Sequence, residues 1–308
     1  MHIPDGFLSI PVWATMDAIA APSVAYIAHR AQREFDHHKI PLMGVMGAFI
    51  FAAQMINFPV GSGTSGHLVG GALLSFTLGP AAASIVMTAI LATQALVFQD
   101  GGVLALGANV FNMAIAGVFA GYLPFLLLRG RKAGIFIGGM LSLLVSAALA
   151  LGELLRSGVR MHPTVLAISG GLFVVSAILE GAITVAVMDA LERIQPGFIR
   201  RPEGFDGAAR RLATALAGMS LLLAGAGFFV ASGRPDGIQK LAFEAGIAAH
   251  ARTLFTSPLA EYKLQMMASP FLARSLAGLI GLLVIYVVCL AVSRVLVAAR
   301  PALGREGV

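Results

Sequence analysis

The chain begins MHIPDGFL, and its first two residues offer three nitrogen atoms that can bind one metal ion together. These are the terminal amine of Met1, the backbone amide of His2 and the His2 imidazole. The stretch has neither the basic region nor the small-residue cleavage site of a secretory signal peptide, so we expect the amine to stay free. The start of the chain therefore suggests a chelate for a transition metal.

The elements that must position this chelate are apolar. The chain has 308 residues, of which 58% are hydrophobic and 12% charged, and its mean hydropathy is +0.87. Soluble domains carry about 25% charged residues, and a helix of about 20 apolar residues crosses a bilayer. We therefore predict an all-α integral membrane protein, because lipid forces the backbone to satisfy its own hydrogen bonds. The net charge of +6 is spread over short loops, which indicates membrane topology rather than nucleic-acid binding.

The number of crossings follows from the basic loops. Loops at 30–39 and 129–132 should both be cytoplasmic, so an even number of crossings separates them. The long segment 68–99 is therefore divided at Gly79-Pro80, since proline interrupts a helix. This places the N-terminus outside and the C-terminus in the cytoplasm. The predicted spans are 9–29, 40–58, 68–78, 81–98, 108–128, 133–155, 165–191, 211–231 and 272–294.

The spans group into two parts. We expect a domain of about seven transmembrane helices over 1–195 and a cytoplasmic linker over 196–210, which is polar and contains proline and glycine. A two-span module follows over 211–308, with a polar external loop at 232–270. The single cysteine, Cys289, allows no internal disulfide.

A second histidine is predicted on the same face of the membrane as His2. The loop 59–67, PVGSGTSGH, follows a span that runs from inside to outside, so His67 lies outside with Met1. His67 could supply a fourth nitrogen, and a planar set of four nitrogens suits Ni(II) or Cu(II) rather than tetrahedral zinc. On spacing alone two other interpretations stay open: His2 as part of a frayed terminus, and His67 as a solvated loop residue.

Three motifs resemble the NikM/CbiM family, the substrate-binding (S) subunits of energy-coupling-factor (ECF) transporters for nickel and cobalt. They are MHIPDGFL, FPVGSGTSGHLVGG at 58–71 and FQDGGVLALGANVFNMA at 98–114. The resemblance covers about residues 1–195. It implies that Met1 binds the metal through its amine, His2 through its amide and side chain, and His67 through its imidazole.

The C-terminal part is similar to a second family. SGRPDGIQKLAFEAGI at 232–247 and SPLAEY at 257–262 resemble the small two-span partner proteins of such transporters, the NikN or PDGLE type. The two resemblances together imply a fused subunit that leans towards nickel. They also imply partners: a transmembrane coupling subunit (the T component) and separate ATPase subunits.

Further residues are candidates for supporting roles. Asp5 could hydrogen-bond an imidazole of the site or cap the first helix. Gln94 and Asn109, near the outer ends of their spans, could support the site or join helices. A stripe of small residues follows the first span and suits either packing within this chain or contact with the coupling subunit; it consists of Ala14, Ala18, Ala21, Ala25 and Ala28.

The function expected from these features is capture of Ni(II), or Co(II), from outside a bacterial cell by a multi-pass protein of the inner membrane. The sequence has no GxxxxGKS or GxxxxGKT motif, so ATP hydrolysis is expected in other subunits. We expect neither catalysis nor a bound cofactor, the metal being the transported substrate. The alternatives are a cobalt importer subunit serving cobalamin synthesis, an ATP-independent metal channel, and a membrane metalloenzyme, for which the sequence has no HExxH motif.

Overall fold

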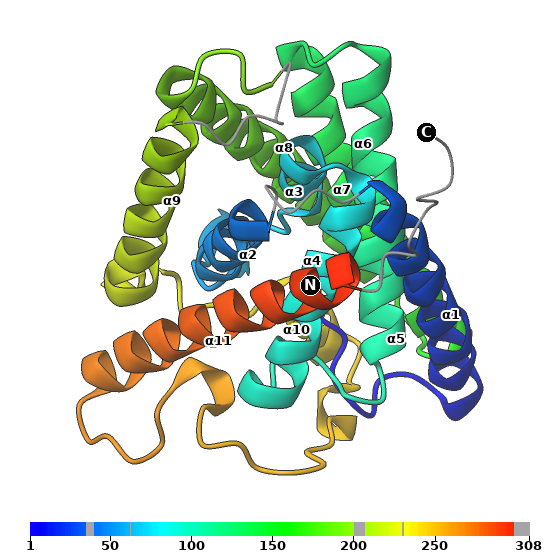
Figure 1. Ribbon diagram of the computed structural model, residues 1–308. Coiled ribbons are helices and arrows are strands. Elements are labelled where there is room, and N and C mark those ends of the chain that lie inside the picture. Colours follow the sequence, from blue (N-terminus) through cyan, green and yellow to red (C-terminus); the bar gives the residue numbers. More distant parts are fainter. Residues whose placement is uncertain (35–39, 62, 200–206, 230, 299–308) are drawn as a thin grey trace.

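The computed structural model describes residues 1–34, 40–61, 63–199, 207–229 and 231–298, and most of these lie in helices (Figure 1). Within them, six helical stretches are long and apolar enough to cross a membrane. The predicted all-α membrane class is confirmed. The helices are α1 (Ile10–Glu34), α2 (Ile40–Gln54), α3 (Gly71–Leu78), α4 (Pro80–Thr93), α5 (Leu106–Asn109), α6 (Gly117–Leu127), α7 (Lys132–Arg156), α8 (Pro163–Ile194), α9 (Gly207–Ala226), α10 (Gly237–Glu244) and α11 (Pro270–Ala298).

The long apolar segment divides where the sequence predicts. Helix α3 ends at Leu78 and α4 begins at Pro80, and Gly79 between them has a φ of 83°. That left-handed backbone suits glycine, and proline is favoured in the first turn of the following helix. Helix α3 is about 12 Å long and every residue in it is buried. It is a short internal helix that covers about half of a bilayer, as the short predicted span 68–78 implies.

Two predicted spans are shorter in the structure than in the sequence analysis. Helix α2 ends at Gln54 rather than near 58, and α9 ends at Ala226 rather than near 231. After α2 the predicted loop forms a hairpin of β1 (Phe58–Gly61) and β2 (Thr64–Gly66), which pair antiparallel. Gly61 and Gly63 have φ of 116° and 74°, which allows the chain to reverse there.

Two helices carry wider, π-helical turns next to the site. Gln94–Phe98 extends α4, and Val110–Ala116 joins α5 to α6. A π-helical turn inserts an extra residue and is frequent at functional sites. These turns hold Gln94 and follow Asn109, two of the predicted supporting residues.

The C-terminal helices pack on α2. Gly44 and Gly47 of α2 leave room for Tyr286 and Cys289 of α11: a Cβ at either glycine would lie 2.9 Å or less from those side chains. Figure 1 shows α9 at one edge of the molecule and α1 at the opposite edge. Part of the predicted linker 196–210, residues 200–206, lies outside the described residues.

The segment between α9 and α11 runs along the end of the bundle that carries the first residues of the chain (Figure 1, yellow to orange). The Arg252 amide donates to the Asp5 carbonyl over 2.9 Å. A residue with a side chain would not fit at position 6, because a Cβ on Gly6 would lie 2.0 Å from the His250 carbonyl oxygen. The predicted external loop 232–270 therefore covers the N-terminal residues.

Candidate metal site

The first residues of the chain are held against the turn that leads into α5. Asn109 clamps Ile3 at two points: its Oδ1 accepts from the Ile3 amide at 2.8 Å, and its Nδ2 donates to the Ile3 carbonyl at 3.1 Å. The Gly102 amide donates to the same carbonyl. Asn109, predicted as a support, therefore fixes the backbone of the residue that follows His2 and does not contact the His2 ring.

Asp5 has a different role from both sequence interpretations. Its carboxylate accepts hydrogen bonds from the amides of Val103 and Leu104 at 2.9 and 2.8 Å. It contacts neither imidazole, and it does not cap α1, which begins only at Ile10. The chain turns at Gly6, with a φ of 92°, so the Asp5 side chain faces the start of α5 instead. Asp5 thus completes the attachment of the N-terminal segment.

Met1 and His67 meet in a buried position. The Met1 amine lies 2.7 Å from Nε2 of His67, and the two residues are each 7% exposed. His67 Nδ1 lies 3.0 Å from the Leu68 carbonyl, so Nδ1 carries the proton and Nε2 presents its lone pair. Burial, then the charges of the terminal amine and His2, lower the pKa of His67 to about 4. The imidazole is therefore neutral at physiological pH, as a metal ligand must be.

His2 lies beside His67 with its ring nearly parallel. The ring centroids are 5.6 Å apart and the ring planes differ by 6°, and His2 is 5% exposed. Its Nδ1 lies 3.1 Å from Oδ1 of Asp100. The following residue, Gly101, has a φ of 97°, and a Cβ there would lie 3.1 Å from the His2 Cβ. The absence of a side chain at Gly101 allows this close approach.

Tyr262 of the C-terminal part holds Asp100 from the other side. Its hydroxyl donates to Oδ2 of Asp100 over 2.6 Å, and its ring stacks on Phe98. Burial raises the pKa of Asp100, but His2, Tyr262 and the terminal amine outweigh burial, and the pKa lies below its usual range. Burial and the Asp100 charge raise the pKa of Tyr262. The carboxylate is therefore ionised and the hydroxyl remains a donor.

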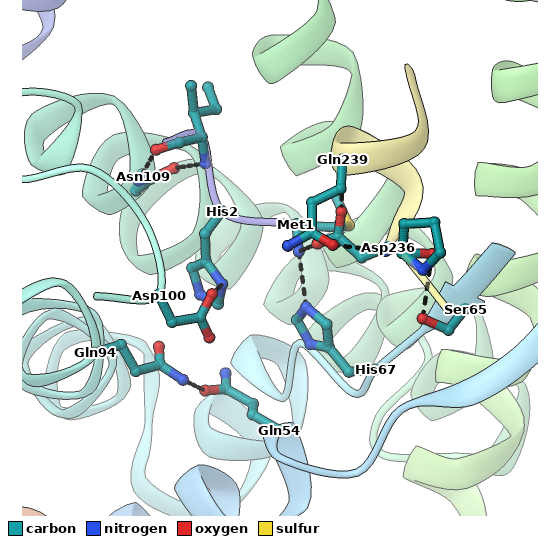
Figure 2. A network of polar contacts seen from close by, with 12 residues as sticks. Met1, His2, Gln54, Ser65, His67, Gln94, Asp100, Asn109, Asp236 and Gln239 are labelled. Carbon is teal, nitrogen blue, oxygen red and sulfur yellow. Dashed lines mark hydrogen bonds and ion pairs between the residues drawn. The ribbon is translucent and has the colours of Figure 1, made fainter. Parts of the chain in front are cut away.

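Asp236 makes the second carboxylate contact. Its Oδ2 lies 2.7 Å from the Met1 amine (Figure 2). Burial raises the pKa of Asp236, but the terminal amine and His67 outweigh burial and lower it. The terminal amine is thus paired with the Asp236 carboxylate and the His2 ring with the Asp100 carboxylate.

The loop that carries His67 is fixed from behind by two buried side chains. Both Glu180 oxygens accept backbone hydrogen bonds, from Val69 and Gly70, at 2.8 Å each. Gln54 donates to the Val69 carbonyl at 2.7 Å, and its own oxygen accepts from Gln94 at 2.8 Å. Gln94, predicted as a support, therefore acts through Gln54 on the backbone two residues after His67.

A cavity of about 430 Å³ adjoins the site. His67 and Asp100 of the first half line it, together with Asp236, Tyr262 and Arg274 of the C-terminal half. Both halves of the chain therefore contribute walls to the cavity beside the site.

The alanine stripe of α1 lies on the outside of the molecule. Ala18, Ala21 and Ala25 are exposed, whereas Ala14 and Ala28 are partly buried. In the part of the chain that the structure describes, no helix covers the middle of the stripe, so packing within this chain does not explain it.

Four residues have roles that do not follow from the sequence: Asp100, Glu180, Asp236 and Tyr262. The PDGI motif drew attention to Asp236, but its contact with Met1 spans 235 residues of chain. No spacing rule brings two such distant positions together. Asp100 lies directly after a predicted span, where the sequence gives no hint of its partner.

The fold and the site together define a helical multi-pass membrane protein with a buried nitrogen-rich site at its N-terminus. Comparison with known proteins specifies the family. The CbiM family model, described as the cobalt uptake substrate-specific transmembrane region, matches residues 2–198, and the PDGLE domain model matches residues 210–298. The chain belongs to the CbiM family and continues into a PDGLE domain.

Individual relatives agree with this assignment. A chain from Archaeoglobus fulgidus, whose name describes a fused nickel transport protein NikMN, is 31% identical over 96% of this chain and 98% of its own length. The cobalt transport protein CbiM of Geobacter sulfurreducens is 32% identical over 70% of this chain and 67% of its own. A crystal structure of a truncated transition metal transporter matches with a TM-score of 0.56 at 36% identity, covering 63% of this chain and 99% of that one.

Proposed function

We propose that this protein is the substrate-binding membrane subunit of an ATP-driven ECF-type importer that captures Ni(II), or Co(II), from outside the cell. The observation that carries the proposal is the buried Met1 amine, whose nitrogen lies 2.7 Å from Nε2 of His67. A terminal amine is normally solvated, and its burial against an imidazole of a distant loop favours a ligand role. Membership of the CbiM family supports the same function.

The proposed ligands are the Met1 amine, the His2 amide and imidazole, and the His67 imidazole. A chelate that includes the His2 amide must use Nδ1, because Nε2 points to the far side of the ring. Nδ1 now contacts Asp100, so metal binding would exchange that contact. The amide and the amine must both lose a proton, so metal binding releases protons.

Nickel is favoured over cobalt on two grounds. A planar set of nitrogens matches the geometry that Ni(II) prefers. The relative that matches almost the whole chain is named for nickel transport, whereas the relatives named for cobalt match a smaller part of it. A cobalt importer subunit serving cobalamin synthesis is the alternative, and competition between the two ions during binding distinguishes them.

Energy coupling requires partners in this proposal. The exposed small residues Ala18, Ala21 and Ala25 suit close approach by a helix of a transmembrane coupling subunit, with ATP hydrolysed by separate subunits. The N-terminus and the loop 232–270 would face outside and the C-terminus the cytoplasm, following the positive-inside rule.

The first test is nickel binding by the purified protein and three variants. One variant carries a single glycine before Met1, the second is His67→Ala, and the third is the control His29→Ala, at an exposed histidine near the other end of α1. We expect the native chain and the control to bind nickel alike, and the other two to bind it far more weakly. Unchanged binding by the extended chain would remove the amine from the ligand set.

A second test separates this function from an ATP-independent channel. The protein alone, in liposomes, should bind nickel without carrying it across the membrane. Sustained nickel flux without partners or ATP would favour the channel.

A further inference from the structure

Asp236 of the PDGLE domain directly contacts one of the proposed metal ligands. The Asp236 carboxylate lies 2.7 Å from the Met1 amine, with its side chain 13% exposed and that of Met1 7% exposed. Figure 2 shows the carboxylate of Asp236 and the ring of His67 both directed at the amine. The amine is thus held between one group from each half of the chain.

Asp236 is itself held in place by α10. Its Oδ1 accepts from the Gln239 amide at 2.8 Å, and the Gln239 side chain accepts from the Asp236 amide, which forms a capping box. The two carboxylate oxygens are therefore divided: Oδ1 starts the helix and Oδ2 faces Met1. The division fixes the direction in which Oδ2 points.

The same strand that leads to His67 also anchors Asp236. Ser65 in β2 hydrogen-bonds the two residues that precede Asp236. Its amide donates to the Pro235 carbonyl at 2.9 Å and its hydroxyl to the Arg234 carbonyl at 2.7 Å. Ile238 and Leu241 of α10 are fully buried. Asp236 and His67 are therefore parts of one local unit and keep their positions relative to each other.

We propose that Asp236 is a positioning residue of the metal site: its Oδ2 accepts an N–H of the Met1 amine and directs the nitrogen lone pair to the ion bound by His67. This inference rests on the proposed function. An amine bound to a metal keeps two N–H groups, so Oδ2 has a donor in the occupied site as well. Groups that orient metal ligands by hydrogen bonds commonly govern affinity.

The charge of Asp236 is compatible with both states of the site. The metal-free amine carries one positive charge as an ammonium. A divalent ion bound to a deprotonated amide also adds one positive charge. A carboxylate beside the amine therefore neutralises the site before and after metal binding, and its effect on affinity comes from geometry.

The test compares Asp236→Ser and Asp236→Asn with the native chain in nickel affinity. Serine and asparagine both still cap α10, so the fold is kept, which thermal unfolding checks. Serine has no second oxygen for the amine, and asparagine, if its oxygen caps the helix, turns an NH₂ group towards it. We expect both variants to bind nickel about tenfold more weakly or worse, with a changed absorption spectrum of the bound nickel.

Glu244→Gln is the matched control. It removes a carboxylate from the other end of α10, where Glu244 pairs with Lys240, and should leave affinity and spectrum unchanged. Native affinity in both Asp236 variants would overturn the inference while leaving the proposed ligand set intact.

A double-mutant cycle identifies the route of the effect. In the chain extended by one glycine the amine has moved, so Asp236→Ser should cause no further loss of nickel affinity. An equal loss in both backgrounds would mean that Asp236 acts through the fold, and the inference would be wrong. If the extension alone leaves nickel affinity unchanged, the amine is not a ligand, and both the proposed function's ligand set and this inference fail.

Discussion

The first five residues of the chain are held in two different ways. The Ile3 backbone is fixed by the Asn109 side chain and the Gly102 amide, and the Asp5 carboxylate by amides of the turn before α5, all within the CbiM part of the chain. Met1 and His2 are held by the carboxylates of Asp236 and Asp100. The hydrogen bonds of Ile3 and Asp5 involve none of the proposed metal ligands, whereas the contacts of Met1 and His2 engage the nitrogens that a metal would bind. A permanent attachment thus lies beside contacts made by the proposed ligands, among which metal binding would exchange the one between His2 and Asp100.

The permanent attachment should matter most for stability. Asn109→Ala leaves the buried Ile3 amide without its acceptor and its carbonyl with one donor fewer, at a cost of about 3 kcal/mol. We expect a clearly lower melting temperature in detergent and weaker nickel binding, because the start of the chain is released. Gln265→Ala, at an exposed amide, is the control. A native melting temperature for Asn109→Ala would show that the two kinds of contact do not differ in this way.

Loss of the support that Glu180 gives to the His67 loop should have the next largest effect on the free energy of unfolding. Glu180→Gln keeps one acceptor oxygen but turns an NH₂ group towards a backbone amide of Val69 or Gly70, which should cost about 2 kcal/mol. Asp189→Asn on the same helix removes an exposed ion pair with Lys132 and should cost less than about 1 kcal/mol. Chemical or thermal unfolding measures both. Equal effects from the two substitutions would argue against a special role for Glu180.

Loss of a contact beside His2 and Asp100 should lower the free energy of unfolding least. Tyr262→Phe removes the donor to Asp100 but keeps the ring stacked on Phe98, so we expect a loss of about 1.5 kcal/mol. Tyr286→Phe in α11 serves as the control for loss of a hydroxyl. Thermal unfolding without nickel gives the comparison. A larger effect than that of Asn109→Ala would reverse the proposed order of the two regions.

Much of the fold was predictable because each signal was local. Apolar length predicted the helices, and Gly79-Pro80 predicted where α3 and α4 separate. The hairpin after α2 was missed because the apolar run continues past Gln54 to Phe58, and composition alone does not mark the end of that helix. The meeting of Met1 with His67 was predicted from their shared face of the membrane and from the family resemblance, which makes both ligands of one metal ion.

The supports of the site were harder to predict. Asn109 and Gln94 were found because polar residues near the ends of apolar spans are conspicuous, yet both act on backbone or on another amide rather than on an imidazole. Asp5 was expected to bond an imidazole of the site or to cap the helix that follows it, because both are partners close to it in the predicted arrangement. Its partners are about 100 residues away, and only the turn at Gly6 reveals them. Contacts between distant loops depend on packing that no short pattern encodes.

The two buried glutamines behind His67 form a chain with a direction. Gln94 donates to Gln54, and Gln54 donates to the Val69 carbonyl. Both hydrogen bonds therefore run in the same direction, from Gln94 towards Val69. A glutamate at position 54 would turn an oxygen towards the Val69 carbonyl, and a glutamate at 94 would leave Gln54 without its donor. An amide has one donor end and one acceptor end, and that asymmetry, more than its polarity, is what both positions require.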